Sequence, residues 1–209
     1  MGIAFLLNGH IIIQIQQSIL MKRIEVGCGG IPQAFREWFP EYIYKKDAVS
    51  YILDNGWNKP RDIVRLLLAA QNDSLHCNDT AFTQAAFDSL RKEYSKNSLT
   101  EIRQELQSLY SSEEIEMVVR LLRGGPQFTT AEGIRKQAAK GSRARAFWDE
   151  RQDDILEDFY RVGFWGNINR SNARCLWRWN HKGDTGVLTG NGWELAIHPA
   201  LCSELSIFL

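Results

Sequence analysis

The segment that decides the fold is DFYRVGFWGNINRSNARCLWRWNHKGD, residues 158–184. Its first residues continue a run of apolar side chains at helical spacing that begins at Phe147. Beyond Gly163 the pattern changes to the short runs FWGNI and CLWRW, which are rich in the aromatic and β-branched residues typical of strands. The turn residues of HKGD follow. The segment therefore predicts a helix over residues 147–162 that leads into short strands.

The elements on either side complete a recognisable order. A helix is predicted over 113–123, and Gly124-Gly125-Pro126 ends it. Thr129 and Glu132 have the spacing of a capping box, which predicts a second helix that ends near Gly141. A hairpin, or wing, is expected between Cys175 and His198. The order of helix, extended piece, helix, helix and hairpin predicts a winged helix-turn-helix over residues 111–209.

Residues 1–110 predict a helical region. Apolar residues recur at helical spacing in 46–54, from Pro60 onward, in 80–94 and in 99–110. Asn55-Gly56 is a signal for a helix end, and Pro60 favours the first turn of a helix. Residues 11–24 fit a helix or a strand equally. The fold class expected for the whole chain is mainly α, with the winged helix following the helical region.

Composition excludes some classes of protein. The 209 residues carry 25 Lys and Arg against 25 Asp and Glu, so a general polyanion binder is excluded and any basic surface is local. The 4 cysteines form no close pair and share no ligand spacing with the histidines, which favours a reducing cytoplasm and predicts neither a metal site nor a cofactor. The apolar stretch at the N-terminus is interrupted by polar residues and lacks a basic start, so we expect neither a membrane span nor a signal peptide.

Three motifs resemble the C-terminal half of bacterial AAA/STAND-like P-loop ATPases, many of which are found in anti-phage defence loci. They are FREWFPEYI, NGWNKPRDIVRLL and FYRVGFWGN with a later IHPAL, and their order and spacing cover residues 11–201. The resemblance implies a lid-like helical region and a winged helix that follow an ATPase core. The phosphate-binding pattern GxxxxGK[ST] is absent from this sequence. We therefore expect no ATPase or other enzyme activity from this chain.

The same resemblance implies a role for Arg61, which starts a predicted helix. In such ATPases an arginine at this place senses the nucleotide of a neighbouring core, because a guanidinium group is always charged and matches phosphate geometry. The alternative is a surface arginine paired with Asp62.

A local basic excess raises nucleic-acid binding as a hypothesis. Between Arg120 and Lys182 lie thirteen Lys and Arg against seven Asp and Glu. The stretch 140–145, KGSRAR, predicts a phosphate-binding loop. The candidate contacts are Lys140, Arg143, Arg145, Arg170, Arg174, Arg178 and Lys182.

The acidic residues argue for a different role. Six of the seven lie on the predicted third helix, namely Asp149, Glu150, Asp153, Asp154, Glu157 and Asp158. In a helix-turn-helix this helix enters the major groove, where an exposed row of carboxylates would repel the phosphates. We therefore expect this face to dock a basic protein surface or a second copy of the chain. The expected function is a non-catalytic regulatory or interaction module. The alternative is a nucleic-acid-binding winged-helix protein, such as a DNA-binding regulator, although we expect any nucleic-acid binding by this chain to be weak and non-specific.

Two further expectations concern aromatic and histidine residues. Trp177 and Trp179 have the two-residue spacing of a strand, so they point to one face. Core packing is favoured for them over stacking on bases. His198, which precedes Pro199, is expected to form structural hydrogen bonds.

Overall fold

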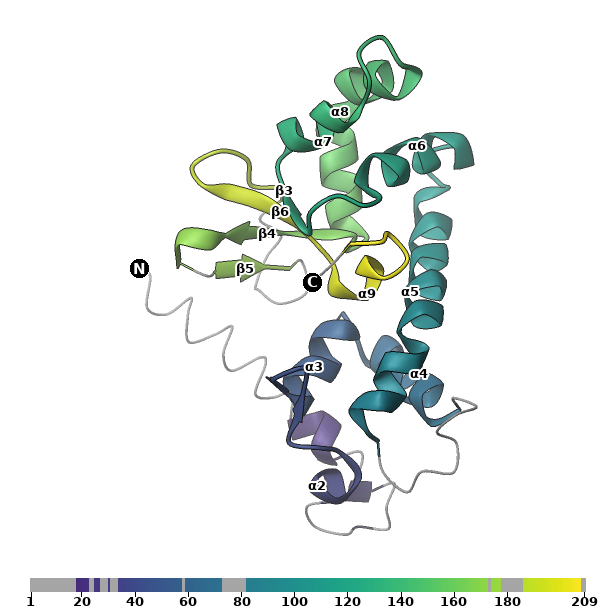
Figure 1. Cartoon of the computed structure of the whole chain (residues 1–209), viewed down its shortest axis with the longest axis vertical. Helices are drawn as coiled ribbons and strands as arrows, with labels where there is room; N and C mark the ends of the chain where they lie inside the picture. The colour runs from purple at the N-terminus through teal and green to yellow at the C-terminus, as the bar shows by residue number, and fades with distance from the viewer. Residues whose placement is uncertain are drawn as a thin grey trace. The chain divides into compact units, whose positions relative to one another are not determined.

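The computed structural model describes residues 18–22, 25–26, 30, 34–57, 59–72, 82–172, 174–177 and 186–207 (Figure 1). These residues are mainly α-helical, with a few short antiparallel strands, which confirms the mainly α part of the fold class predicted from the sequence. They form two compact units, and the boundary falls between Tyr94 and Ser95. Most of the ambiguous segment 11–24 lies outside the described residues.

The first unit is built from helices and one small hairpin. Its elements are α2 (Ala34–Trp38), β1 (Tyr42–Ile43), β2 (Lys46–Asp47), α3 (Ala48–Asn55), α4 (Pro60–Gln71) and the start of α5 (Gln84–Leu106). Asp47 caps α3, because its side chain accepts a hydrogen bond from the backbone N–H of Ser50 at 2.9 Å. The predicted helix end at Gly56 and the predicted first-turn position of Pro60 are both confirmed.

The turn between α3 and α4 depends on a glycine. A Cβ atom added to Gly56 would lie 2.6 Å from Cγ1 of Ile63 and 3.0 Å from its Cα. The two helices therefore approach each other more closely than any other residue at this position would permit. Trp57 follows with a φ of 49° and is buried.

Aromatic rings fill the core of this unit. Phe39 stacks on Phe35 and on Phe82, with ring centroids 4.4 and 4.5 Å apart. Phe87 makes an edge contact with Tyr51 at 5.6 Å. Burial raises the pKa of Tyr51 to about 12.

Helix α5 corrects one expectation. Separate helices were predicted over 80–94 and 99–110 from the recurrence of apolar residues at helical spacing. The structure instead has one helix, Gln84–Leu106. Ser95 and Ser98 are buried in it, and the hydroxyl of Ser95 accepts a hydrogen bond from the backbone N–H of Glu204 at 2.8 Å. A contact distant in sequence thus outweighs the local helix propensity.

The second unit combines helices with a four-stranded sheet. After the end of α5 come α6 (Ser112–Leu122), β3 (Phe128–Thr129), α7 (Ala131–Gln137), α8 (Arg143–Arg161), β4 (Trp165–Asn169), the short 3-10 helix η1 (Arg170–Asn172), β5 (Arg174–Leu176), β6 (Trp193–Ile197) and α9 (Pro199–Cys202). A capping box of Ser111 and Glu114 begins α6. The capping box predicted for α7 is wrong by one residue, because Thr130, not Thr129, accepts the N–H of Gly133.

The sheet has the strand order β3-β6-β4-β5, and its neighbours are antiparallel (Figure 1). Central strand β6 aligns Ile197 with Trp165 of β4 and Ala196 with Phe128 of β3. The predicted hairpin between Cys175 and His198 is wrong for the described residues, since β5 and β6 lie on opposite sides of β4. Gly166 of β4 allows the indole ring of Trp177 to pack directly on this strand, because a Cβ atom at Gly166 would lie 2.6 Å from that ring.

Helix α8 packs on the sheet through a cluster of large rings. Trp165 is fully buried, and its indole N–H donates to the carbonyl of Leu156 at 3.0 Å. Phe159 stacks on Trp165 with centroids 5.1 Å apart. Helix α8 buries Trp148, Ile155, Leu156, Phe159 and Tyr160, whereas Val162, which follows its last residue, is half-buried.

Candidate functional site on helix α8

Helix α8 begins four residues earlier than the sequence predicts. Ser142 caps it by accepting the N–H of Arg145 at 3.2 Å. Arg143 and Arg145 therefore occupy the first turn of the helix, and the predicted phosphate-binding loop over 140–145 is wrong for its second half. Only Lys140 and Gly141 remain in the turn between α7 and α8.

Most of the described cations proposed for nucleic acid already have partners. Arg145 donates to Asp149 at 3.0 Å and to the backbone carbonyl of Arg135 at 2.8 Å. Arg143 donates to Glu113 at 2.6 Å. These internal ion pairs neutralise charge that a phosphate backbone would need.

The remaining candidates differ in position. Arg170 pairs with Glu194 at 3.3 Å and lies over the ring of Phe128, 5.0 Å from its centroid. Lys140 is exposed, and no ion pair of its side chain occurs among the described residues. Arg174 lies in β5. Arg178 and Lys182 lie outside the described residues.

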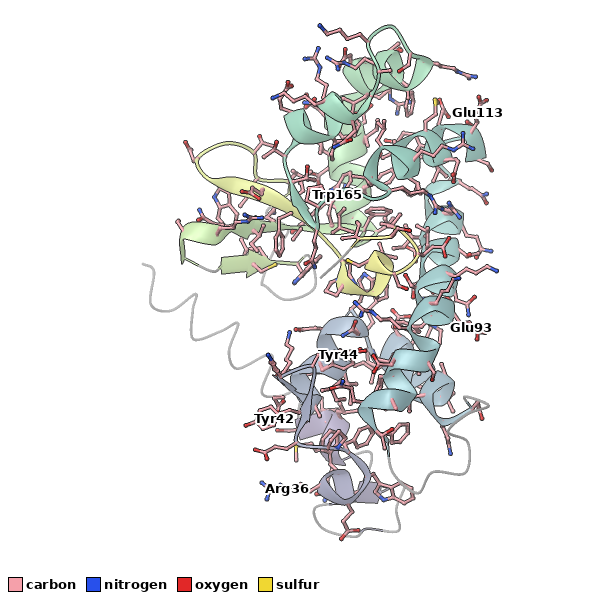
Figure 2. The ribbon with its side chains drawn as sticks, viewed as in Figure 1. Arg36, Tyr42, Tyr44, Glu93, Glu113 and Trp165 are labelled. Atoms are coloured by element: carbon pink, nitrogen blue, oxygen red, sulfur yellow. The ribbon has the colours of Figure 1, made fainter. Side chains whose placement is uncertain are left out.

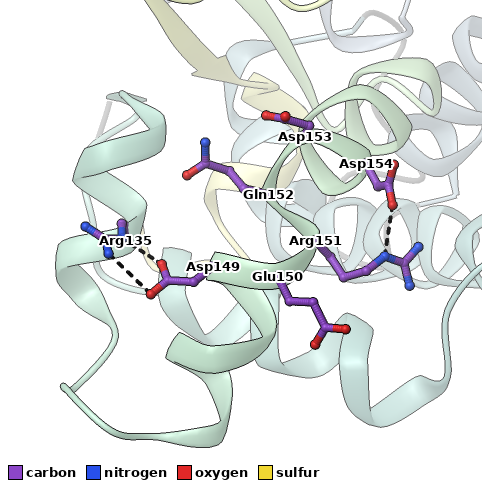
Figure 3. A pocket seen from close by; sticks show the side chains of 7 residues that line it. All are labelled: Arg135, Asp149, Glu150, Arg151, Gln152, Asp153 and Asp154. Atoms are coloured by element: carbon purple, nitrogen blue, oxygen red, sulfur yellow. Dashed lines mark hydrogen bonds and ion pairs between the residues drawn. The ribbon is translucent and has the colours of Figure 1, made fainter.

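Asp149 is the best-partnered carboxylate of α8. Its two oxygens accept hydrogen bonds from Nε and Nη2 of Arg135 at 2.6 and 3.3 Å (Figure 3). Arg145 approaches from the same helix. The hydrogen bonds from Arg135, and then those from Arg145, lower the pKa of Asp149, so it remains charged in mildly acidic solution. This bidentate pair joins α7 to the first half of α8.

The exposed carboxylates surround an open hollow of about 530 Å³ whose lining is almost entirely polar. Figure 3 shows Glu150, Asp153 and Asp154 around it, with Arg151 paired to Asp154 at 2.9 Å. Among the described residues, Glu150 and Asp153 take part in no ion pair. These two side chains therefore hold charge that is available to a partner.

The last two acidic residues are not part of an exposed face, contrary to the sequence-based expectation. Glu157 is half-buried and accepts the backbone N–H of Val187 at 3.1 Å. Asp158 accepts a hydrogen bond from the hydroxyl of Tyr110 at 2.8 Å, and only 15% of the Asp158 side chain is exposed. Both carboxylates hold other parts of the second unit in place. The predicted face of α8 is thus reduced to Asp149, Glu150, Asp153 and Asp154.

Arg61 lies in the first unit, at the start of α4. Its side chain is 71% exposed, and its Nε lies 3.5 Å from Oδ1 of the buried Asp62. This is the geometry of the surface pair that was the alternative to nucleotide sensing, although it leaves the guanidinium group accessible.

Trp177 and His198 contact each other in the second unit. Their ring centroids are 4.9 Å apart, and Nδ1 of His198 accepts the N–H of Ala200 at the start of α9. The structural role predicted for His198 is therefore confirmed. Trp177 is half-buried against it, whereas Trp179 lies outside the described residues.

Sequence reasoning missed Tyr110, Arg135 and Arg151 as parts of this site. Tyr110 lies between α5 and α6, yet it contacts α8 through its hydroxyl, its ring edge and its ring face. No local pattern predicts such contacts, because they depend on how the helices pack. Only the charge of Arg135 and Arg151 was visible beforehand.

Within the described part of the chain, no group of three or more His, Cys, Asp and Glu side chains could hold a metal ion. Within the same residues, no helix is long and apolar enough to cross a membrane.

Part of the chain matches a known protein family. Residues 15–103 match the family described as the FunZ-associated C-terminal helical domain. The match extends from the start of the described residues through most of α5, so this part of the chain is similar to a C-terminal helical domain. No curated protein and no solved structure matches the chain.

Proposed function

We propose that the chain is a non-catalytic interaction module whose second unit is a winged helix used for docking to a protein. The order α6, β3, α7, α8, β4, β6 supports this assignment, with β4 and β6 as paired wing strands and β5 as an addition beside β4. The partner offers a basic surface, on a second copy of the chain or on an ATPase core.

The observation that carries this proposal is the distribution of partners on α8. The cations at its start are paired within the protein, whereas Glu150 and Asp153 are exposed carboxylates without an ion pair among the described residues. In a helix-turn-helix this helix would face DNA. A net negative face favours a basic protein surface instead, because complementary charge steers and orients association.

The test is reversal of the available charge. The double variant Glu150→Lys with Asp153→Lys should weaken association and reduce its salt dependence, measured by light scattering of the whole chain at low and high salt. The matched control is Asp88→Lys with Glu93→Lys, two exposed carboxylates of α5 in the first unit. Equal association of all three proteins, alone and with a FunZ protein or a P-loop ATPase partner, would contradict the proposal.

The family match supports an accessory role. Its description associates the domain with FunZ and places it at a C-terminus. A bacterial P-loop ATPase context, cytoplasmic location and a part in anti-phage defence remain our proposals from the sequence motifs. In that setting Arg61, exposed at the start of α4, reaches a nucleotide on the ATPase core.

Nucleic-acid binding is the second candidate, and the turn between α7 and α8 is the feature that favours it. Lys140 is exposed there, and 71% of the side chain of Arg143 is exposed although it pairs with Glu113. Binding through such charge alone is weak, independent of sequence and sensitive to salt. Fluorescence anisotropy with random and AT-rich duplexes at two salt concentrations tests it. Sequence-selective binding that persists at physiological salt would favour this function over docking.

A further inference from the structure

Helix α8 is interrupted in its middle. Arg151 has φ −118° and ψ 16°, well outside the helical region, and the helix resumes on its other side. Sharp bends in helices normally occur at proline, at glycine or serine pairs, at a bulge, or where a side chain inserts. The sequence from Arg143 to Arg161 contains no proline, glycine or serine. The cause of the interruption must therefore lie in contacts made by the helix.

Tyr110 contacts α8 on both sides of the interruption. Its ring meets Phe147 before the interruption and Phe159 after it, with centroids 6.3 and 6.4 Å apart. The guanidinium group of Arg151 itself lies over the ring, 5.1 Å from its centroid. Tyr110 is buried, and burial, followed by its hydrogen bond to Asp158, raises the pKa of its hydroxyl. One neutral, buried ring is thus held against both halves of the helix.

The two halves of α8 are also fixed to different neighbours. Asp149, before the interruption, is held by Arg135 of α7. Asp158, after it, is held by Tyr110, which precedes α6. Among the described residues of α8, one hydrogen bond between side chains spans the interruption. In it the indole N–H of Trp148 donates to Oε1 of Gln152 at 3.1 Å.

Charge repulsion favours the same interruption. In a continuous helix, Asp149 would lie beside Asp153, and Glu150 beside Asp154, at the i,i+4 spacing where like charges destabilise. Arg151 pairs with Asp154, which removes one of these charges, but Asp153 and Glu150 make no ion pair among the described residues. A continuous helix through the interruption would therefore bring like charges together, and the bend reduces this repulsion.

We propose that α8 carries a reversible hinge at Arg151, held bent by the contact of its guanidinium group with the ring of Tyr110. The bend does not depend on a residue that breaks helices, so its release leaves the second unit folded. A partner that takes Arg151 away from the ring converts α8 into one continuous helix and changes the spacing of the carboxylates on either side. This inference concerns the free chain and does not depend on the docking function.

The test is the Cα secondary shift of residue 151 in the isotope-labelled whole chain, that is, the deviation of its Cα chemical shift from the random-coil value of the same residue type, because this deviation separates helical from non-helical backbone. In the unmodified protein the secondary shift of residue 151 should fall below those of residues 147 and 155. In Arg151→Leu, which keeps helix propensity but has no charge to place over the ring, it should rise to the helical value. Arg151→Lys, which keeps the cation, should retain most of the depression.

A helical shift at residue 151 in the unmodified chain would overturn the proposal, and so would a non-helical shift that persists in Arg151→Leu. Tyr110→Phe is the second variant, because it keeps the ring while it removes the hydrogen bond to Asp158. Its residue 151 should remain non-helical, and a change to the helical value there would assign the bend to Asp158 instead. Unchanged amide shifts in β4 and β6 show that each variant is folded, and loss of these shifts in Arg151→Leu would contradict a hinge that opens without unfolding.

Discussion

The first unit is held together by stacked aromatic rings, whereas the second unit adds a set of ion pairs that join its helices. In the first unit Phe39 lies between Phe35 and Phe82. In the second, Arg103 donates to Glu116 at 2.6 Å and Arg135 to Asp149 at 2.6 Å, each between two helices. The difference teaches that the charges counted along a sequence overstate the charge available at a surface, because some of the charged side chains pair with one another between packed helices.

The apolar surfaces of the units differ as well. Large apolar side chains that are exposed in the described residues of the first unit are Ile19, Val26, Trp38, Tyr42, Tyr44, Val64 and Leu68. The described part of the second unit contributes Leu109. Figure 2 shows Arg36, Tyr42 and Tyr44 along one side of the first unit. The described surface of the second unit thus exposes fewer large apolar side chains than that of the first unit.

The largest expected effect is on the ring cluster of the second unit. Phe159→Ala should cost about 3–5 kcal/mol of unfolding free energy, because a buried ring is lost and a cavity remains. The ring centroids of Trp165 and Phe164 each lie 5.1 Å from that of Phe159, so the lost contacts are apolar ones. Urea unfolding followed by tryptophan fluorescence measures the loss. A cost below about 1 kcal/mol would show that this unit depends on its ion pairs more than on its rings.

The next effect tests the tight turn of the first unit. Gly56→Ala should destabilise by about 1–3 kcal/mol, since the added methyl group overlaps Ile63 and the helices must separate. Thermal unfolding followed by circular dichroism measures it. In an Ile63→Ala background, which lacks the overlapping Cγ1, Gly56→Ala should cost less than it does in the unmodified chain. An equal cost in both backgrounds would indicate that another contact limits this turn.

A paired substitution separates structural from available carboxylates on α8. Glu157→Lys should cost about 1–2 kcal/mol, because the backbone N–H of Val187 loses its acceptor. Asp153→Lys, four residues earlier on the same helix and without an ion pair among the described residues, should change stability by about 0.5 kcal/mol or less. Urea unfolding of both variants decides, and equal costs would remove the distinction between the two carboxylates.

The smallest effect concerns acid. The folded-state pKa of Asp149 is lowered by Arg135, so its contribution to stability is present above the unfolded pKa of about 3.9 and is lost as the pH falls through the folded value. The stability gap between the unmodified protein and Asp149→Asn should therefore be wider at pH 7 than at pH 3 in urea unfolding. An equal gap at the two pH values would contradict this role of Arg135.

Sequence patterns predicted the elements whose signals are local. Asn55-Gly56, Pro60 and the apolar face of α8 carried their information within a few residues, and the structure agrees with them. The fusion of two predicted helices into α5 depends on the contact of Ser95 with Glu204, which is remote in sequence. The partners of Glu157 and Asp158 are equally remote, so charge and spacing alone placed both on an exposed face. Strand order was also beyond local patterns, because β4 separates β5 from β6.

The position of β6 has a consequence for synthesis on the ribosome. This strand lies between β3 and β4, but it is the last strand of the sheet in chain order. Helices α6, α7 and α8 leave the ribosome before β6 does. The sheet that packs against α8 is therefore incomplete until Ile197 has emerged, since Ile197 of β6 is the register partner of Trp165 in β4. Domains fold as units during synthesis, so the second unit must complete its folding late, while the helices of the first unit are already outside the tunnel. A chaperone that binds nascent chains would therefore encounter the aromatic side chains of α8 before the completed sheet buries them.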